Sequence, residues 1–332
     1  MLNKKNVIAG SLFTVLLTGC GGGSDDNTSS PKFSLGVSDA PIADLSEVVV
    51  CFNQIELKGS NTKTVFTVGK NDGDNDGMIS ANDLCLDDDG SVIPNTVGID
   101  LKQYTGSNSI YLVDDINIEA GDYTQLRLVM SDGSYGIDAQ TGEKISVSIP
   151  AQDTPSGKTP PNELKLDGFT ATLGGVVDFT LEFDLRKAMT DPKNQDGYLL
   201  KPRGVRLVDN NEAGHIEGTV SETLLSDNQC TPLSDPTANV ASVYIYKGAD
   251  LAIETLEDNG GDEAKNLPYA STTVTFDSQH TSYNFEIGFI QTGEYTLAIS
   301  CDVEDDPEVD EDINFITSQN ITVETGTTEV SF

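Results

Sequence analysis

The chain alternates short runs of apolar and polar residues, and Gly, Pro, Asn and Asp separate the runs. Residues 123–130 (YTQLRLVM) and 144–149 (KISVSI) alternate with a period of two, which is typical of strands with one buried face. Residues 48–52 (VVVCF) form a continuous apolar run, which indicates a buried strand. Helical periodicity of useful length is absent. The pattern therefore predicts an all-β protein.

The strand pattern and the chain length predict two β-sandwich domains in tandem. A polar stretch at residues 209–214 (DNNEAG) marks a boundary between them. Beyond it, seven strands within about 120 residues suit a Greek-key sandwich. The expected strands are 32–37, 46–57, 123–130, 144–149, 169–173, 177–185, 215–220, 240–246, 271–276, 283–289, 294–300, 315–323 and 328–332. The predicted divisions are a signal peptide at 1–19, a flexible tether at 20–31, a first domain at 32–209, a linker at 210–214 and a second domain at 215–332.

The N-terminal residues indicate export. Lys4 and Lys5 precede a short apolar run at 7–17, which is shorter than the roughly 20 residues of a membrane span. The tetrapeptide at 17–20 (LTGC) then resembles the lipobox of bacterial lipoproteins. That resemblance implies that Cys20 is lipidated with palmitate-type acyl chains and anchors the protein in the cell envelope. Because Gly21 follows, it implies the outer membrane, on its periplasmic or cell-surface face. The alternative is an ordinary signal peptide with a cysteine near its cleavage site.

Four further cysteines suit disulfide bonds in an exported protein. They are Cys51, Cys85, Cys230 and Cys301. Three connectivities are possible, and the predicted domain boundary favours Cys51–Cys85 with Cys230–Cys301.

The clearest chemical motif is an acidic stretch at residues 72–83 (DGDNDGMISAND). It resembles the 12-residue calcium loop of EF-hands and, because it ends in Asp, that of dockerins. Alternating oxygen ligands can wrap one Ca²⁺ ion, and a glycine at position 6 permits the sharp turn. The expected ligands are Asp72, Asp74, Asp76, the Met78 carbonyl, Ser80 and Asp83. The alternative is a solvated acidic turn without an ion.

Charge and motif content narrow the function classes. The chain carries 54 acidic and 19 basic residues, a formal net charge of −35, so nucleic acid is an unfavourable partner. Solubility in a salty environment is the simplest reason for this acidity. His215 and His280 lie outside any nucleophile or metalloprotease motif, and we predict no catalytic residues. Asp184, Arg186, Lys201 and Arg203 suggest cross-strand ion pairs or, alternatively, an anion site.

Three ordered stretches carry a family resemblance. They are 33–41 (FSLGVSDAP), 121–128 (GDYTQLRL) and 179–208, which includes GYLLKPRGVRLV. They resemble the bacterial lipoprotein family described as domain of unknown function 4382, over about residues 32–209. The resemblance implies an exported β domain and supplies no catalytic residues. Residues 215–220 (HIEGTV) and 293–297 (GEYTL) resemble carboxypeptidase-regulatory or transthyretin-like domains, which are usually non-catalytic.

These observations predict a non-catalytic envelope lipoprotein, stabilised by structural Ca²⁺, that binds or scaffolds an unknown protein or glycan. The alternative is a calcium-dependent, carbohydrate-active hydrolase with unrecognised carboxylates. The absence of Trp and an aromatic content of 7% disfavour a sugar-stacking platform.

Overall fold

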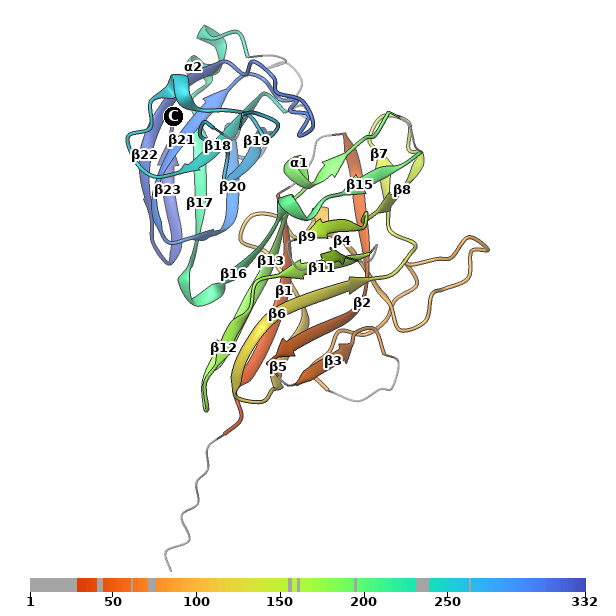
Figure 1. Cartoon of the computed structure of the whole chain (residues 1–332). Coiled ribbons are helices and arrows are strands. Elements are labelled where there is room, and N and C mark those ends of the chain that lie inside the picture. Colours follow the sequence, from red (N-terminus) through yellow and green to blue (C-terminus); the bar gives the residue numbers. More distant parts are fainter. Residues whose placement is uncertain are drawn as a thin grey trace, which may run out of the picture.

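The computed structural model describes residues 29–40, 44–60, 62–70, 76–154, 157–159, 162–193, 196–230, 239–262 and 264–332. Strands dominate this part of the chain and its helices are short, so the all-β prediction is confirmed (Figure 1). Within the described residues, no helix has the length and apolar character needed to cross a membrane.

The strands up to residue 209, with their loops, are here called the first body. They are β1 (Lys32–Ala40), β2 (Leu45–Gly59), β3 (Lys63–Thr67), β4 (Val97–Asp100), β5 (Ile110–Asn117), β6 (Gly121–Met130), β7 (Tyr135–Asp138), β8 (Lys144–Ser148), β9 (Gln152–Thr154), β10 (Gly157–Thr159), β11 (Glu163–Leu166), β12 (Phe169–Ala171), β13 (Val176–Asp184), β14 (Met189–Thr190), β15 (Tyr198–Leu200) and β16 (Val205–Asp209). The short helices of this body are α1 (Leu185–Ala188), η1 (Leu101–Gln103), η2 (Pro202–Gly204) and η3 (Asn210–Glu212).

Two sheets make up most of the first body. The four-stranded sheet has the order β16-β13-β1-β5, in which β1 and β13 are parallel. The ten-stranded sheet has the order β11-β6-β2-β7-β8-β15-β14, with β12 on β6 and with β3 and β4 on β2. A separate hairpin joins β9 to β10.

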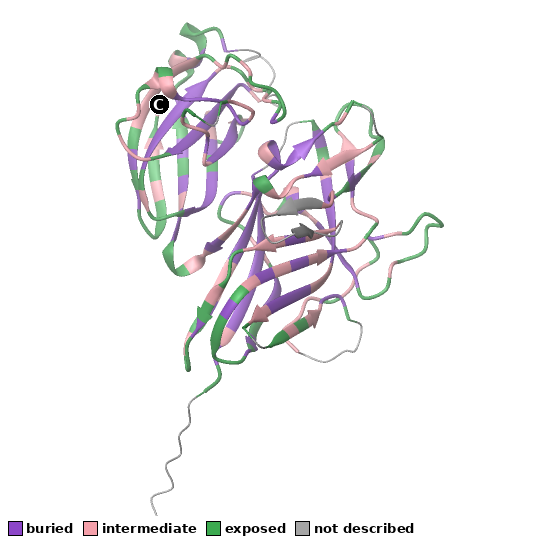
Figure 2. Ribbon diagram, in the orientation of Figure 1, coloured by how far each residue is buried: buried purple, intermediate pink, exposed green. Residues whose placement is uncertain are grey.

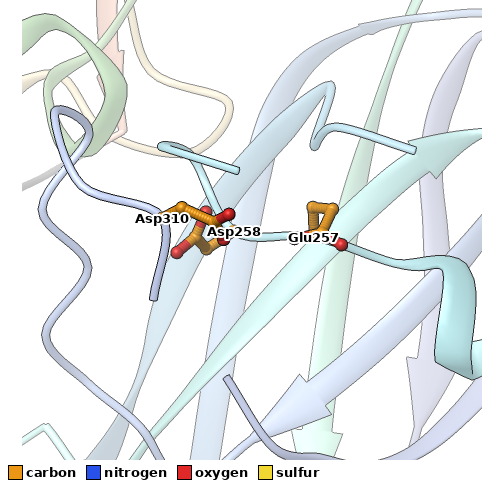
Figure 3. A group of neighbouring side chains, drawn as sticks. All are labelled: Glu257, Asp258 and Asp310. Carbon is orange, nitrogen blue, oxygen red and sulfur yellow. The ribbon is translucent and has the colours of Figure 1, made fainter. Parts of the chain in front are cut away.

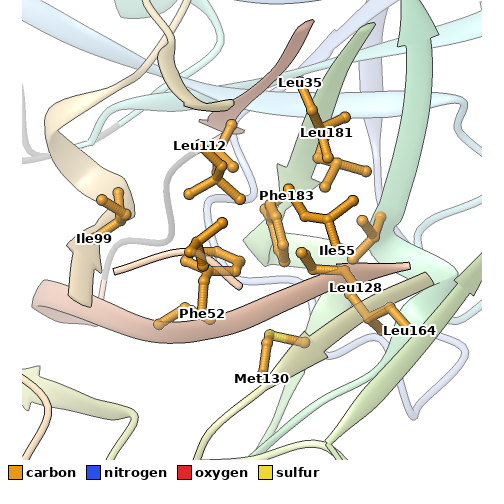
Figure 4. Close-up of a cluster of buried hydrophobic side chains, with 14 of the residues drawn as sticks. Leu35, Phe52, Ile55, Ile99, Leu112, Leu128, Met130, Leu164, Leu181 and Phe183 are labelled. Atoms are coloured by element: carbon orange, nitrogen blue, oxygen red, sulfur yellow. The ribbon is translucent and has the colours of Figure 1, made fainter. Parts of the chain in front are cut away.

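The core of the first body lies between these two sheets. Leu35, Leu181 and Phe183 of the four-stranded sheet meet Phe52 and Leu128 of the larger sheet (Figure 4). The rings of Phe52 and Phe183 pack edge to face at 6.2 Å between centroids. Buried residues follow the inward faces of the strands and exposed residues the edges and loops (Figure 2). Burying each of these side chains contributes roughly 2 kcal/mol, so the alternating pattern selects which face turns inward.

The remaining strands form the second body. They are β17 (Ala213–Val220), β18 (Ala241–Lys247), β19 (Ala270–Asp277), β20 (Ser282–Gln291), β21 (Gly293–Ser300), β22 (Phe315–Val323) and β23 (Gly326–Ser331), with the short helices α2 (Glu222–Asp227) and η4 (Ile253–Thr255). One seven-stranded sheet runs β22-β21-β18-β19-β20-β17-β23 around its own core. Its two edge strands approach each other, because Gln319 Nε2 donates to Ser331 O at 3.1 Å. All seven strands expected in this region are present.

The stretch expected to be a linker has regular structure. Residues 210–212 form η3, and β17 begins at Ala213 directly after it. Val208, Ala213 and Phe289 pack together across this junction. The exact domain limits stay a prediction, but a free linker at 210–214 does not describe these residues.

The two favoured disulfides are present. Cys51 is bonded to Cys85 with 5.9 Å between Cα atoms, and Cys230 is bonded to Cys301 with 4.8 Å between Cα atoms. Each disulfide therefore joins segments of one body.

Candidate functional site

The predicted calcium loop lies between β3 and β4, and the structure describes its second half. Asp72 and Asp74 lie outside the described residues, as does the lipidation residue Cys20. Asp76 and Met78 are half-buried, whereas Ser80 and Asp83 are exposed. The structure thus brings positions 5 and 7 of the predicted loop against the first body and leaves positions 9 and 12 facing solvent.

The middle of the loop is docked on β5. Met78 forms a β-bridge with Val113. On either side of it, Gly77 O accepts a hydrogen bond from Asp114 N (2.7 Å), and Ile79 N donates to a carbonyl of β5 (3.0 Å). Because these flanking bonds leave Met78 at a non-hydrogen-bonded position of the bridge, its own carbonyl points away from β5. This orientation suits the carbonyl ligand that a calcium loop takes from position 7.

Local conformation also matches the motif. Gly77 has a φ of +78°, and a Cβ atom there would lie 2.5 Å from Asp114 O, so this turn requires glycine. Asp76 Oδ1 accepts a hydrogen bond from Met78 N two residues on (3.0 Å). Ile79 packs against the hydrophobic core of the first body.

The acidic loop borders a hollow of about 900 Å³ between the loop and β5. Asp76, Asp114 and Asp115 line it together with Tyr111. Lys32 forms an exposed ion pair with Asp115 at 3.1 Å, which neutralises only part of this charge. The arrangement therefore presents several carboxylates to a cation approaching from solvent.

Asn82, which the sequence did not single out, fastens the end of the loop to β4. Its Nδ2 donates to Gly98 O (2.7 Å) and its Oδ1 accepts from Gly98 N (2.9 Å). A Cβ atom on Gly98 would lie 2.6 Å from the Leu84 Cβ and 3.0 Å from the Cys85 sulfur. Any larger residue than glycine at position 98 would prevent the segment containing Leu84 and Cys85 from packing against β4.

The disulfide Cys51–Cys85 holds the same segment over the outer face of β2. Val49, Cys51, Cys85 and Tyr135 form a small buried cluster there, separate from the main core. The apolar run at 48–52 is therefore buried on both faces, because the segment between β3 and β4, here called the insertion, covers the face that the main core does not reach. Asp87, Asp88 and Asp89 are exposed, and Asp87 Oδ1 accepts bonds from amides of its own turn.

The basic residues near residue 200 contact the second body. Lys201 Nζ lies 2.8 Å from Glu308 Oε2, and Arg203 pairs with the same carboxylate. Arg203 Nη2 also donates to Pro307 O (2.8 Å), and Arg186 Nη1 donates to Val303 O (2.9 Å). These cations are thus bonded to protein groups across the contact between the bodies, here called the seam, and Arg203 Nε also donates to Lys187 O of the first body (3.1 Å).

Three carboxyl side chains are fully buried at or near the seam: Asp39, Glu182 and Asp184. Arg206 lies opposite Glu182, with Nη2 4.0 Å from Glu182 Oε1 and Nη1 3.7 Å from Asp184 Oδ2. Burial raises the pKa of Glu182 to about 8, although Arg206 opposes the shift. Burial also raises the pKa of Asp39 well above its usual value, and Glu182 and Asp184 add to that rise. Glu182 and Asp184 share Arg206, while Lys102 acts on Asp39 and both Lys187 and Arg186 act on Asp184. Burial outweighs these cations and drives the three carboxyl groups toward the protonated form.

The sequence does not distinguish these buried carboxyl groups from exposed ones. Residues 179–185 (FTLEFDL) alternate, so the acidic positions read as the solvent face of a strand. The second body covers that face, and Asp184 Oδ2 accepts a hydrogen bond from Ser271 N (3.2 Å).

Neither histidine has a catalytic arrangement in the described structure. His215 Nδ1 accepts a hydrogen bond from Phe289 N (3.2 Å), and burial lowers the pKa of His215. His280 is exposed and pairs with Asp277 at 2.5 Å. Both contacts are structural ones within the second body.

Comparisons with known proteins add a family but no activity. The family model described as "Domain of unknown function (DUF4382)" matches residues 30–202. No curated protein shows significant sequence similarity to the chain.

Three solved structures align with the chain at low similarity. A proposed cell adhesion protein from Bacteroides fragilis has 10% identity and a TM-score of 0.22, covering 91% of this chain and 92% of that one. The Bacillus anthracis TIE protein has 10% identity and a TM-score of 0.17, covering 91% and 50%. A proposed adhesin from Bacteroides ovatus has 9% identity and a TM-score of 0.19, covering 98% of each chain. With TM-scores this low, the likenesses support no argument about fold or function.

Proposed function

Because this chain belongs to the family described as "Domain of unknown function (DUF4382)", a description that specifies no activity, we propose its role from its own residues. It is a non-catalytic lipoprotein of the bacterial outer membrane. Its lipid anchor is Cys20, and a structural Ca²⁺ ion in the loop 72–83 stabilises the first body. The second body is held away from the membrane, where it binds or scaffolds a protein or glycan.

The observation that carries this proposal is the position of the start of β1 relative to the second body. The described chain enters β1 at Lys32, and the second body meets the opposite end, where Ala40 is in register with Asp184. A strand of nine residues is about 30 Å long. A chain tethered before Lys32 therefore presents the second body on its far side (Figure 1).

The calcium part of the proposal rests on the loop. The proposal is supported by the positive φ of Gly77 at position 6 and by the Met78 carbonyl at position 7, which points away from β5. Extracellular calcium modules bind at about 10⁻⁴ to 10⁻³ M, which suits a compartment where calcium is plentiful. Because the loop is fastened by Asn82 and by the Cys85 disulfide, an ion there stabilises the insertion over β2.

Membrane fractionation with labelled palmitate tests the anchor. Wild-type protein should carry the label and sediment with membranes, whereas Cys20→Ser should be unlabelled and soluble. Ser24→Ala, a change within the same tether, is the matched control and should behave as wild type. A Cys20→Ser protein that stays on membranes would refute the anchoring.

Site-specific photo-crosslinking on intact cells tests the binding role. The second body has a polar hollow of about 980 Å³, whose lining includes Thr322 and Glu329. A crosslinker at Thr322 should give a discrete adduct, whereas one at the exposed Val176, at the tethered end, should not. Equal adducts from both positions, or none from Thr322, would count against presentation by the second body.

A further inference from the structure

Five acidic residues of the second body gather where two loops meet. They are Glu257, Asp258, Asp305, Asp310 and Glu311. Their carboxylate oxygens form two groups of three, Glu257 with Asp258 and Asp310, and Asp258 with Asp305 and Glu311, and within each group all oxygens lie within 4.8 Å of one another. Asp258 belongs to both groups. Figure 3 shows the side chains of Asp258 and Asp310 next to each other, with Glu257 beside them on the loop of Asp258.

Asp258 itself lacks the partners that a buried carboxylate needs. The residue is only 1% exposed, and its Oδ1 is buried without a hydrogen-bond partner. Its Oδ2 accepts a hydrogen bond from the Glu311 amide. The neighbouring Asn259 Oδ1 is also buried and unpartnered. Leaving such oxygens unsatisfied costs about 1 to 3 kcal/mol each, so the geometry lacks a positive partner at this point.

The protein supplies little positive charge here. Among the described residues, Lys265 is the cation in ion-pair contact with the cluster, through Glu257. The Lys265 side chain is 51% exposed, and an exposed pair of this kind contributes little. Arg186 donates to the hydroxyl of Tyr244 (3.3 Å), which in turn donates to Asp305 (2.9 Å). One half-exposed lysine and Arg186, whose charge acts on Asp305, do not balance five carboxylates.

One oxygen from each residue of a group lies no more than 4.8 Å from the others, so the three oxygens of a group can share one cation. Ca²⁺ binds six to eight oxygens at about 2.4 Å, so two ligands on opposite sides of one ion lie about 4.8 Å apart. Mg²⁺ demands stricter octahedral geometry and keeps more of its water. We propose that Asp258 is the central ligand of a calcium site formed with carboxylates of Glu257, Asp305, Asp310 and Glu311. This site is separate from the loop 72–83, and no sequence motif predicts it.

An ion bound to Asp258 would restrain the loop at residues 305–311, which contacts the first body at the seam. Residues 305–311 carry three of the five acids, Asp305, Asp310 and Glu311, and also Glu308, which pairs with Lys201 and Arg203 of the first body. The two loops are already in close contact, because a Cβ atom on Gly260 would lie 2.0 Å from Val309 O. Calcium bound to Asp258 therefore couples the position of the second body to the calcium concentration.

Calcium-binding stoichiometry on the mature chain tests the site directly. Equilibrium dialysis with ⁴⁵Ca²⁺ should show one ion fewer per chain in Asp258→Asn than in wild type. Asp310→Asn, at an exposed position, should weaken this site about tenfold without affecting folding. Asp262→Asn, an exposed acid on the same loop outside the cluster, is the control and should bind as wild type.

The same measurement separates this site from the loop 72–83. Asp76→Ala should lose an ion that Asp258→Asn keeps, and the double variant should lose both. Wild-type stoichiometry in folded Asp258→Asn and unchanged affinity in Asp310→Asn would overturn the site, whatever Asp76→Ala shows.

Hydrogen exchange tests the coupling to the seam. Millimolar Ca²⁺ should slow exchange of amides in 301–314 and 198–206 about tenfold in wild type and leave them unchanged in Asp258→Asn. Slowing confined to 257–262 would overturn the coupling while leaving the ion site in place.

Discussion

At the scale of single residues, the most informative position is Glu182. It is fully buried on β13, and its pKa of about 8 lies well above the usual 4.5 because burial penalises its charged form. The folded state therefore holds the proton more tightly than the unfolded chain does. Stability from this group is present below pH 4.5 and is lost as the pH rises through 8.

Glu182→Gln should consequently raise the melting temperature at pH 9 and have little effect at pH 4. A shift of this size corresponds to at most about 5 kcal/mol, and we expect an increase of roughly 5 °C. Melting curves from pH 4 to 9 measure it, with Glu329→Gln on the exposed face of β23 as the control. A lower melting temperature for Glu182→Gln at pH 9 would show that the charged pair with Arg206 stabilises the fold instead.

At the scale of elements, the alternation of apolar and polar residues predicted the positions of the strands, because each strand has one face against a core. The expected strand 315–323 coincides with β22, and 123–130 lies within β6. The favoured Cys51–Cys85 disulfide linked the insertion to β2. That the insertion buries the outer face of β2 was not predictable, because the insertion has no periodicity. The helices α1 and α2 are too short to leave a periodic signal, and each begins at a capping side chain, Asp184 or Ser221.

Removing the disulfide over β2 tests whether the insertion is part of the core. The variant Cys51→Ala/Cys85→Ala should lose roughly 3 kcal/mol of unfolding free energy, since the bond closes a loop of 34 residues. Urea denaturation measures the change. A loss below about 1 kcal/mol would mean that the insertion contributes little to stability.

Gly98→Ala probes the same contact without touching the sulfur atoms. The added Cβ meets Leu84 at 2.6 Å, and we expect a loss of about 1 to 3 kcal/mol. Val92→Ala, at an exposed position of the insertion, is the control. Equal stability of Gly98→Ala and wild type would indicate that the insertion does not pack on β4 in solution.

At the scale of the whole molecule, the seam is the feature least predictable from the sequence. Its bonds join residues about 100 positions apart, such as Arg203 and Pro307, and its acids resemble an ordinary solvent-facing strand. The acidic residues at 302–312 (DVEDDPEVDED) likewise read as a solvated loop. Glu182 and Asp184 are buried where the two bodies pack together, whereas the acids of 302–312 are half-buried or exposed.

Gly288→Val should loosen the seam, because a Cβ atom there would lie 1.8 Å from Gly106 O of the first body. We expect a larger radius of gyration in small-angle X-ray scattering and two separate transitions in calorimetry. Lys193→Ala, an exposed change in the first body, should alter neither. A single transition with an unchanged radius would contradict a tightly packed seam.

Thermal unfolding of the mature chain in calcium and in chelator tests the central claim most directly. Free calcium at 100 times its dissociation constant stabilises a site by about 2.7 kcal/mol, so the wild-type melting temperature should rise by several degrees. The rise should be smaller in Asp76→Ala, absent in Asp76→Ala/Asp258→Asn and undiminished in the exposed control Asp88→Ala. Identical wild-type curves at that calcium concentration and in chelator would contradict a calcium-stabilised envelope module.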